Sequence, residues 1–120
     1  RSSVYRQTAQ AAKQASVKHV MRPAARSDIL RQYEYYVLEG VPDIADRFID
    51  AVHQSISHIC QMPGIGAPKH LINPNLSGLR VWPVKEFDDI RIYYLTENEE
   101  IKIIRVLHGR RDVRSILEEA

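Results

Sequence analysis

Three stretches rich in β-branched and aromatic residues follow one another in the second half of the chain. They cover residues 79–84, 90–95 and 101–107. Residues of these types favour β-strands, and the connections at residues 85–89 and 96–100 are short enough for hairpins. The sequence therefore predicts an antiparallel meander, and this limits the chain to folds that give such a sheet a cover.

The predicted strands carry apolar residues on both faces. Ile90 and Ile92 alternate with Tyr93 and Leu95, whereas an antiparallel sheet with one solvated face would alternate apolar and polar residues more cleanly. We expect helices to pack on one face. The terminal segment 113–120 has length for only two helical turns, so we expect a partner protein to supply the rest of the cover on the other face.

The first half of the chain predicts a short strand and two helices. Residues 17–22 form a β-type run that stops at Pro23, and Ser27 or Asp28 is expected to cap a helix that ends near Tyr36 or Leu38.

A second helix is expected to open at Pro42, after the break at Gly40. Its apolar residues recur at intervals of three to four, as in an amphipathic helix: Ile44, Phe48, Ala51, Val52, Ile56 and Ile59. The fold class expected is α+β, with an N-terminal strand and a helical hairpin packed on an antiparallel sheet of three to four strands.

Two segments are expected to lie outside regular structure. Residues 1–16 are polar, without an apolar stripe, and we interpret them as an N-terminal extension, disordered or left from a fusion, that precedes a single domain at 17–120. Residues 62–68 hold two prolines and two glycines, which predicts an irregular hinge between the helical half and the β half.

Composition limits the class of protein. A length of 120 residues suits one domain, and no apolar run approaches the roughly 18 residues of a membrane helix. Cys60 is the single cysteine, which predicts core packing and a reduced, cytoplasmic setting. His53, His58 and His70 lack cysteines at zinc spacing, so neither a metal nor another cofactor is expected.

Positive charge gathers near the C-terminus although the net charge is only +2. Residues 101–114 hold five Lys or Arg and one acid, Asp112. The predicted strands carry Arg80, Arg91 and Arg105, and the last strand runs into this basic cluster. The pattern favours contact with an anionic group or an acidic partner.

The order of several short motifs resembles the ParE branch of the RelE/ParE toxin superfamily over residues 17–118. The motifs are Arg22-Pro23-Ala24-Ala25 before Asp28-Ile29, then Gly78-Leu79-Arg80-Val81, Ile90-Arg91-Ile92-Tyr93-Tyr94, and Val106-Leu107-His108-Gly109-Arg110-Arg111-Asp112. The resemblance implies a toxin of a bacterial type II toxin–antitoxin system, in a hetero-oligomer with a ParD-like antitoxin whose extended segment inhibits it.

The superfamily divides by activity. ParE-like members resemble poisons of DNA gyrase that catalyse no reaction, and this is the function expected here. The alternative is a RelE-like endoribonuclease that cuts messenger RNA on the ribosome, in which His108, Arg91 and Arg80 would be the catalytic residues. No Tyr follows the last strand, and Glu86, Asp88 and Asp89 put negative charge where an RNA backbone would pass. Both departures favour the ParE-like function.

The resemblance and the charge pattern together give two sets of candidate contact residues. The residues expected to bind the target are Arg105, Arg110, Arg111 and Arg114. Those expected to bind the antitoxin are Trp82, Tyr93, Arg91 and Arg105. Each has a structural alternative: a strand arginine can be paired internally, a histidine at a strand end can bond a backbone group, and aromatic residues pack across strands.

Overall fold

The computed structural model describes residues 17–120, so the expected extension at 1–16 lies outside the described residues. A strand β1 (Lys18–Met21) leads into two helices, α2 (Pro23–Leu38) and α3 (Pro42–Gln61). Four strands follow: β2 (Ala67–Pro68), β3 (Arg80–Val84), β4 (Phe87–Glu97) and β5 (Glu100–His108). The last element is the helix α4 (Val113–Glu118). Single 3₁₀ turns lie at Pro63–Ile65 and Pro74–Leu76.

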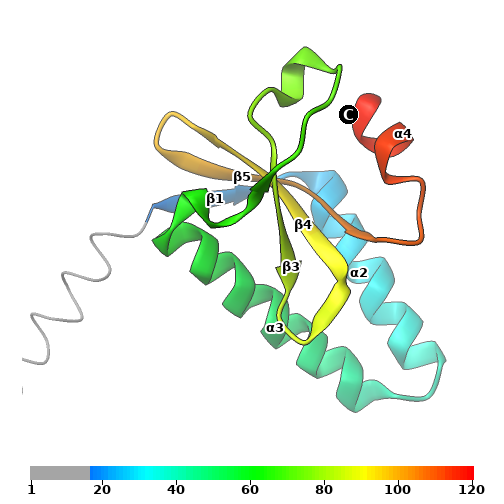
Figure 1. The fold of residues 1–120 in the computed structure, drawn as a ribbon. Coiled ribbons are helices and arrows are strands. Elements are labelled where there is room, and N and C mark those ends of the chain that lie inside the picture. Colours follow the sequence, from blue (N-terminus) through cyan, green and yellow to red (C-terminus); the bar gives the residue numbers. More distant parts are fainter. Residues whose placement is uncertain (1–16) are drawn as a thin grey trace, which may run out of the picture.

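These strands form one mixed sheet in the order β1-β5-β4-β3-β2 (Figure 1). The predicted meander is confirmed as β3, β4 and β5, which pair antiparallel. The sheet has five strands rather than three or four, because β1 adds in parallel to β5 and β2 adds to β3. The hinge predicted at residues 62–68 is therefore wrong in part, since a 3₁₀ turn and a two-residue strand form within it.

The start of α2 also differs from the prediction. The helix begins at Pro23, with Arg22 as the extended N-cap residue and no side-chain cap. Proline suits this first position because its fixed φ is helical and the amide it lacks would have no intrahelical partner. Asp28 lies inside the helix and is buried, so its carboxylate is available for a contact with the sheet.

The helical hairpin covers one face of the sheet, which we call the helix-side face (Figure 1). The predicted stripe of α3 is buried there, including Phe48, Val52, Ile56 and Ile59, and Cys60 packs into the same core as expected. The sheet contributes Ile90, Ile92, Tyr94, Ile101, Ile103 and Val106. Burial of these apolar side chains is the main force that holds the hairpin on the sheet.

The other face is covered by the chain itself. Leu76 and Leu79, from the loop before β3, and Leu117 of α4 form a core with Tyr93, Leu95, Ile104 and Leu107, all at most 2% exposed. The expectation that a partner protein supplies the rest of this cover is therefore wrong, because the loop before β3 supplies it. Sequence periodicity missed the loop because its apolar residues follow no regular spacing.

No helix among residues 17–120 is long and apolar enough to cross a membrane.

Candidate functional site

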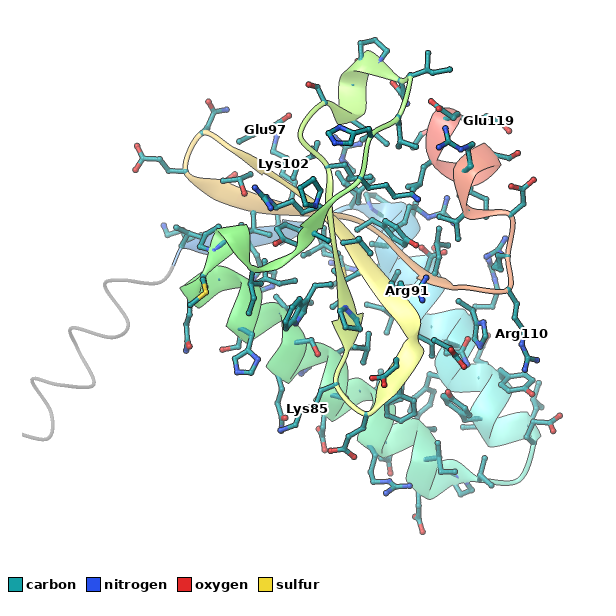
Figure 2. The ribbon with its side chains drawn as sticks, in the orientation of Figure 1. Lys85, Arg91, Glu97, Lys102, Arg110 and Glu119 are labelled. Carbon is teal, nitrogen blue, oxygen red and sulfur yellow. The ribbon has the colours of Figure 1, made fainter. Side chains whose placement is uncertain are left out.

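A basic surface forms where β5 ends beside α2. His108, Arg110 and Arg111 line a pocket of about 450 Å³ with Gln32, Tyr35 and Tyr36 of α2. Both arginines are exposed, and Figure 2 shows Arg110 on the turn after β5, next to α2. Sequence reasoning expected the cluster of cations, but it did not foresee that tyrosines of α2 would form the opposite wall.

His108 has a structural contact within this surface. It is half-buried, and its Nδ1 atom accepts a hydrogen bond of 3.1 Å from the backbone amide of Arg110. An acceptor at Nδ1 leaves the ring proton of a neutral imidazole on Nε2. His108 therefore helps to shape the turn that presents the two arginines.

An acidic surface adjoins the basic one on the other side of His108. Glu86 of the β3–β4 turn and Asp88 and Asp89 at the start of β4 line a pocket of about 430 Å³ together with Tyr36 and His108. The three carboxylates are exposed. This end of the molecule is thus divided between opposite charges, an arrangement that repels a continuous polyanion and suits a protein surface of mixed charge.

Arg105 is held by Asp28 rather than presented to solvent. Its Nε and Nη2 atoms each donate a hydrogen bond of 2.7 Å to the Asp28 carboxylate, which also accepts the Val106 amide at 2.9 Å. The hydrogen bond to Asp28 raises the pKa of Arg105 further above its usual value. This bidentate pair fixes α2 to β5, and it engages a residue that the sequence had suggested as a target and antitoxin contact.

Arg80 is likewise engaged inside the molecule. Its Nη1 atom donates to the Gly66 carbonyl at 2.7 Å and to the Gly64 carbonyl at 3.4 Å. The same turn is held by Tyr94, whose hydroxyl accepts a hydrogen bond from the Gly66 amide at 2.9 Å and donates to the Pro63 carbonyl at 2.7 Å. Arg80 and Tyr94 together fix the turn that precedes β2.

The three residues suggested for a nuclease do not converge. Arg80 pairs directly with Tyr94, and His108 pairs with Ile90, so both belong to the helix-side face but at different positions along β4. Arg91 alternates with Ile90 and Ile92 and therefore points to the other face, where it is exposed. Figure 2 shows Arg91 on β4. No arrangement of these side chains surrounds a single phosphate.

The residues suggested for antitoxin binding differ in their exposure. Trp82 is half-buried and packs against the core of the helix-side face. Tyr93 is 2% exposed, and its burial raises the pKa of the hydroxyl, an effect that the nearby Arg91 guanidinium opposes. Among these residues only Arg91 is exposed, since Arg105 is paired with Asp28.

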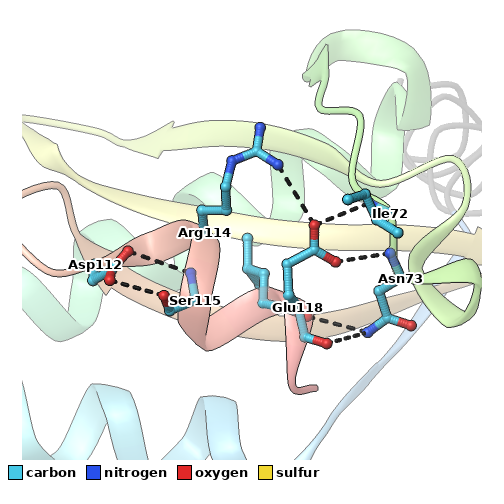
Figure 3. Close-up of polar contacts among 7 residues, drawn as sticks. Ile72, Asn73, Asp112, Arg114, Ser115 and Glu118 are labelled. Atoms are coloured by element: carbon cyan, nitrogen blue, oxygen red, sulfur yellow. Dashed lines mark hydrogen bonds and ion pairs between the residues drawn. The ribbon is translucent and has the colours of Figure 1, made fainter.

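The helix α4 is fastened to the loop before β3 (Figure 3). The Glu118 carboxylate accepts the Ile72 and Asn73 amides at 3.0 and 2.7 Å, and the Asn73 side chain donates to the carbonyls of Leu117, Glu118 and Ala120. Arg114 reaches the same carboxylate at 3.5 Å. We call this set of contacts the α4 clasp. No local motif links Asn73 to a glutamate 45 residues away, so the sequence does not predict the α4 clasp.

Among residues 17–120, no three His, Cys, Asp or Glu side chains come together as a metal site.

Comparison with solved structures identifies the fold class first. The fold is similar to that of a chain in the chromosomal ParDE toxin–antitoxin system from P. aeruginosa, with a TM-score of 0.63 and 18% sequence identity over 78% of this chain and 97% of that one. At this identity the likeness establishes the fold alone, which is a small α+β domain with a helical hairpin on a mixed sheet. No curated protein matches this chain.

The family follows from the sequence comparison. The model of the ParE toxin of the type II toxin–antitoxin system parDE matches residues 20–113, which is most of the chain. The chain belongs to this family and is a ParE-type toxin, in agreement with the resemblance found in its motifs. The match runs from the second half of β1 to the first residue of α4 and includes the basic surface at the end of β5.

Proposed function

We propose that this toxin acts by inhibiting DNA gyrase through the basic surface at the end of β5, and that a ParD-like antitoxin neutralises it. The observation that carries the proposal is the dispersal of the candidate catalytic residues. Arg80 holds the Gly66 carbonyl, and Arg91 points to the opposite face. A poison requires a contact surface, whereas a nuclease requires groups that converge on one phosphate.

The exposed arginines supply that surface. Arg110, Arg111 and Arg114 follow β5 closely in sequence and are all exposed, and Arg114 has only a long contact of 3.5 Å with Glu118. Exposed arginines are common in the centres of protein interfaces because the guanidinium group makes several hydrogen bonds at once. Arg105, which is paired with Asp28, serves in this proposal to position β5 against α2 and does not touch the target.

A supercoiling assay with purified gyrase, run beside a ribosome-dependent RNA cleavage assay, tests the proposal. We expect the wild-type chain to inhibit supercoiling and to leave messenger RNA intact. Replacing Arg110, Arg111 and Arg114 together with Ala should abolish inhibition, whereas His108→Ala should weaken it modestly. The matched control replaces Arg47 and Lys85, two exposed cations on α3 and the β3–β4 turn.

The alternative function, cleavage of messenger RNA, predicts a different result in the same assays. If His108 were an acid or base in RNA cleavage, His108→Ala would lower the cleavage rate by roughly 10² to 10⁴. Transcript cleavage that disappears in this variant, with gyrase unaffected by the wild-type chain, would replace the proposed function with that of a nuclease. Melting temperatures of all variants are compared first, so that loss of fold is not read as loss of function.

A further inference from the structure

Two adjoining pockets lie between α2 and the end of β5. The smaller, of about 210 Å³, is lined by Asp28, Arg31, Gln32, Val106, His108 and Arg111. The larger is the pocket of about 450 Å³ already described, which the two tyrosines of α2 line. Because Gln32, His108 and Arg111 line both pockets, the two form one continuous recess, which we call the α2–β5 recess.

The α2–β5 recess gathers positive charge that the chain does not balance. Arg31, Arg110 and Arg111 are exposed, and in the part of the chain that the structure describes none of them forms an ion pair within 4.0 Å. Among the described residues the lining contains one carboxylate, that of Asp28, and it is already paired with Arg105. Three guanidinium groups around one recess repel one another until an anion lies between them.

Neutral donors add to these cations. Because the His108 Nδ1 atom accepts the Arg110 amide, the proton of the neutral ring lies on Nε2, where it can be donated to a ligand. The half-buried Gln32 side chain lines both pockets and carries two further N–H groups. A carboxylate would bring one negative charge to three guanidinium groups, whereas a phosphate monoester brings three terminal oxygens and a charge of about −1.5 to −2. A phosphate monoester is therefore the better match.

An exposed aromatic ring lies beside these charges. Tyr35 lines the larger pocket and is 54% exposed. Its ring packs edge-on against Tyr36, with 5.7 Å between the ring centroids, and Tyr36 in turn packs against Phe48 and Phe87. The core thus holds Tyr35 from one side and leaves much of its ring open. Such a ring is a platform on which a flat ring, such as a nucleobase, stacks.

The neighbouring groups limit the length of an anionic ligand. The acidic surface lies on the far side of His108, which lines both that pocket and the α2–β5 recess. On the inner side, the buried residues Asp28 and Val106 line the recess. A second phosphate that extended past His108 would meet the carboxylates of the acidic surface and be repelled by them. The rest of the ligand must therefore extend toward Tyr35.

We propose that the α2–β5 recess binds a nucleoside monophosphate. The phosphate lies among Arg31, Arg111 and His108, and the base stacks on Tyr35. The recess overlaps the basic surface proposed to contact gyrase, so a bound nucleotide competes with the target. This competition rests on the proposed function, whereas binding of the nucleotide does not.

Binding is measured with the purified chain by NMR titration and calorimetry. Because stacking accepts any base, adenosine 5′-monophosphate (AMP) is the probe. AMP should shift the backbone signals of residues 31, 35, 108 and 111. It should bind at least about tenfold more tightly than adenosine, which lacks the phosphate, and at least about fivefold more tightly than inorganic phosphate, which lacks the base.

Two results of these titrations would overturn the inference. The first is the absence of shifts at the four residues in about 5 mM AMP, a concentration that fills most of a site with a Kd of about 1 mM. The second is an affinity that rises steadily from AMP to ADP to ATP, since this is the behaviour of diffuse attraction between opposite charges.

Matched variants test the two halves of the site. Arg111→Ala should weaken AMP binding at least about tenfold, whereas Arg26→Ala, which removes an exposed cation of α2 outside the recess, should not. Tyr35→Ala should weaken binding at least about fivefold, and Tyr35→Trp, which keeps an aromatic ring, should retain it. Equal binding by either pair of variants, at unchanged melting temperature, would contradict the proposed site. No measurement here contains gyrase, so failure leaves the proposed function to its own assay.

Discussion

The Arg105 guanidinium and the Asp28 carboxylate form two parallel hydrogen bonds of 2.7 Å between strand β5 and helix α2. The Asp28 side chain is 2% exposed and also accepts the Val106 amide, so every partner it has comes from β5. Removing the arginine would leave the Asp28 carboxylate buried without a countercharge, so the mutation is expected to destabilise the fold strongly.

Arg105→Ala should lower the free energy of unfolding by about 3 kcal/mol, near the lower end for a broken buried pair because Arg105 is itself partly exposed. Chemical denaturation with linear extrapolation measures the change. Arg47→Ala, on the exposed side of α3, is the control and should stay within about 0.5 kcal/mol of the wild type. If Arg105→Ala lowered the free energy of unfolding as little as the control does, the Arg105–Asp28 pair would contribute little to stability.

The sequence predicted the elements of the fold better than their contacts. The apolar stripe of α3 and the β-branched runs of β3 to β5 are local patterns, and both are confirmed. Ser27 or Asp28 was expected to cap a helix, since both residue types are favoured at the N-cap position. The true partner of Asp28 is 77 residues away, and only the packing of α2 on β5 brings the two together.

The candidate site was predictable only as a concentration of charge. Arg110, Arg111 and Arg114 are exposed, as their density suggested, but the sequence did not indicate that Tyr35 and Tyr36 would adjoin Arg110 and Arg111. Nor did it separate Arg80 and Arg105, which bind carbonyls and a carboxylate inside the molecule, from the exposed arginines. That distinction depends on register and on which face each strand residue occupies.

Gly66→Ala should destabilise the fold by about 1–3 kcal/mol, the range for an overpacked site. A Cβ atom at Gly66 would lie 2.7 Å from the Tyr94 hydroxyl oxygen and 2.9 Å from the Val81 carbonyl oxygen, and the Tyr94 hydroxyl cannot move without loss of its hydrogen bonds to Gly66 and Pro63. Gly64→Ala is a control in the same turn, because a Cβ there meets nothing within 4 Å. Equal melting temperatures for the two variants would contradict the tight packing seen at Gly66.

Glu118→Ala should release α4 from the loop before β3 by removing the acceptor for the Ile72 and Asn73 amides. We expect a loss of about 1–2 kcal/mol in stability, since hydrogen bonds to a charged group are involved at a partly exposed position. Amide exchange at residues 72 and 73 should accelerate. The control is Glu119→Ala, which removes a neighbouring exposed carboxylate outside the α4 clasp. Amide exchange at residues 72 and 73 should be unchanged in that variant.

Stability should fall as the pH rises above about 10, because burial raises the pKa of the Tyr94 hydroxyl above its ordinary value of 10.0. The folded state then holds a proton that the unfolded state releases, so the contribution is complete below pH 10 and is lost as the pH passes through the folded-state pKa. Tyr94→Phe should be less stable at neutral pH but decline less steeply in alkali. The measurement is the denaturant midpoint of both chains between pH 8 and 11. An equal decline of the midpoint with pH in the two chains would show that Tyr94 does not contribute.

The parallel pairing of β1 with β5 also governs when the protein can become a toxin during its synthesis. The partner of Lys18 is Glu100, and the partner of Asp28 is Arg105, so these two contacts between the N-terminal half and the sheet both await the last strand. Such distant pairings form late, after the costly closure of a long loop. A nascent chain that stalls before residue 100 has neither contact, so a ribosome that abandons this message early releases a fragment without the complete fold.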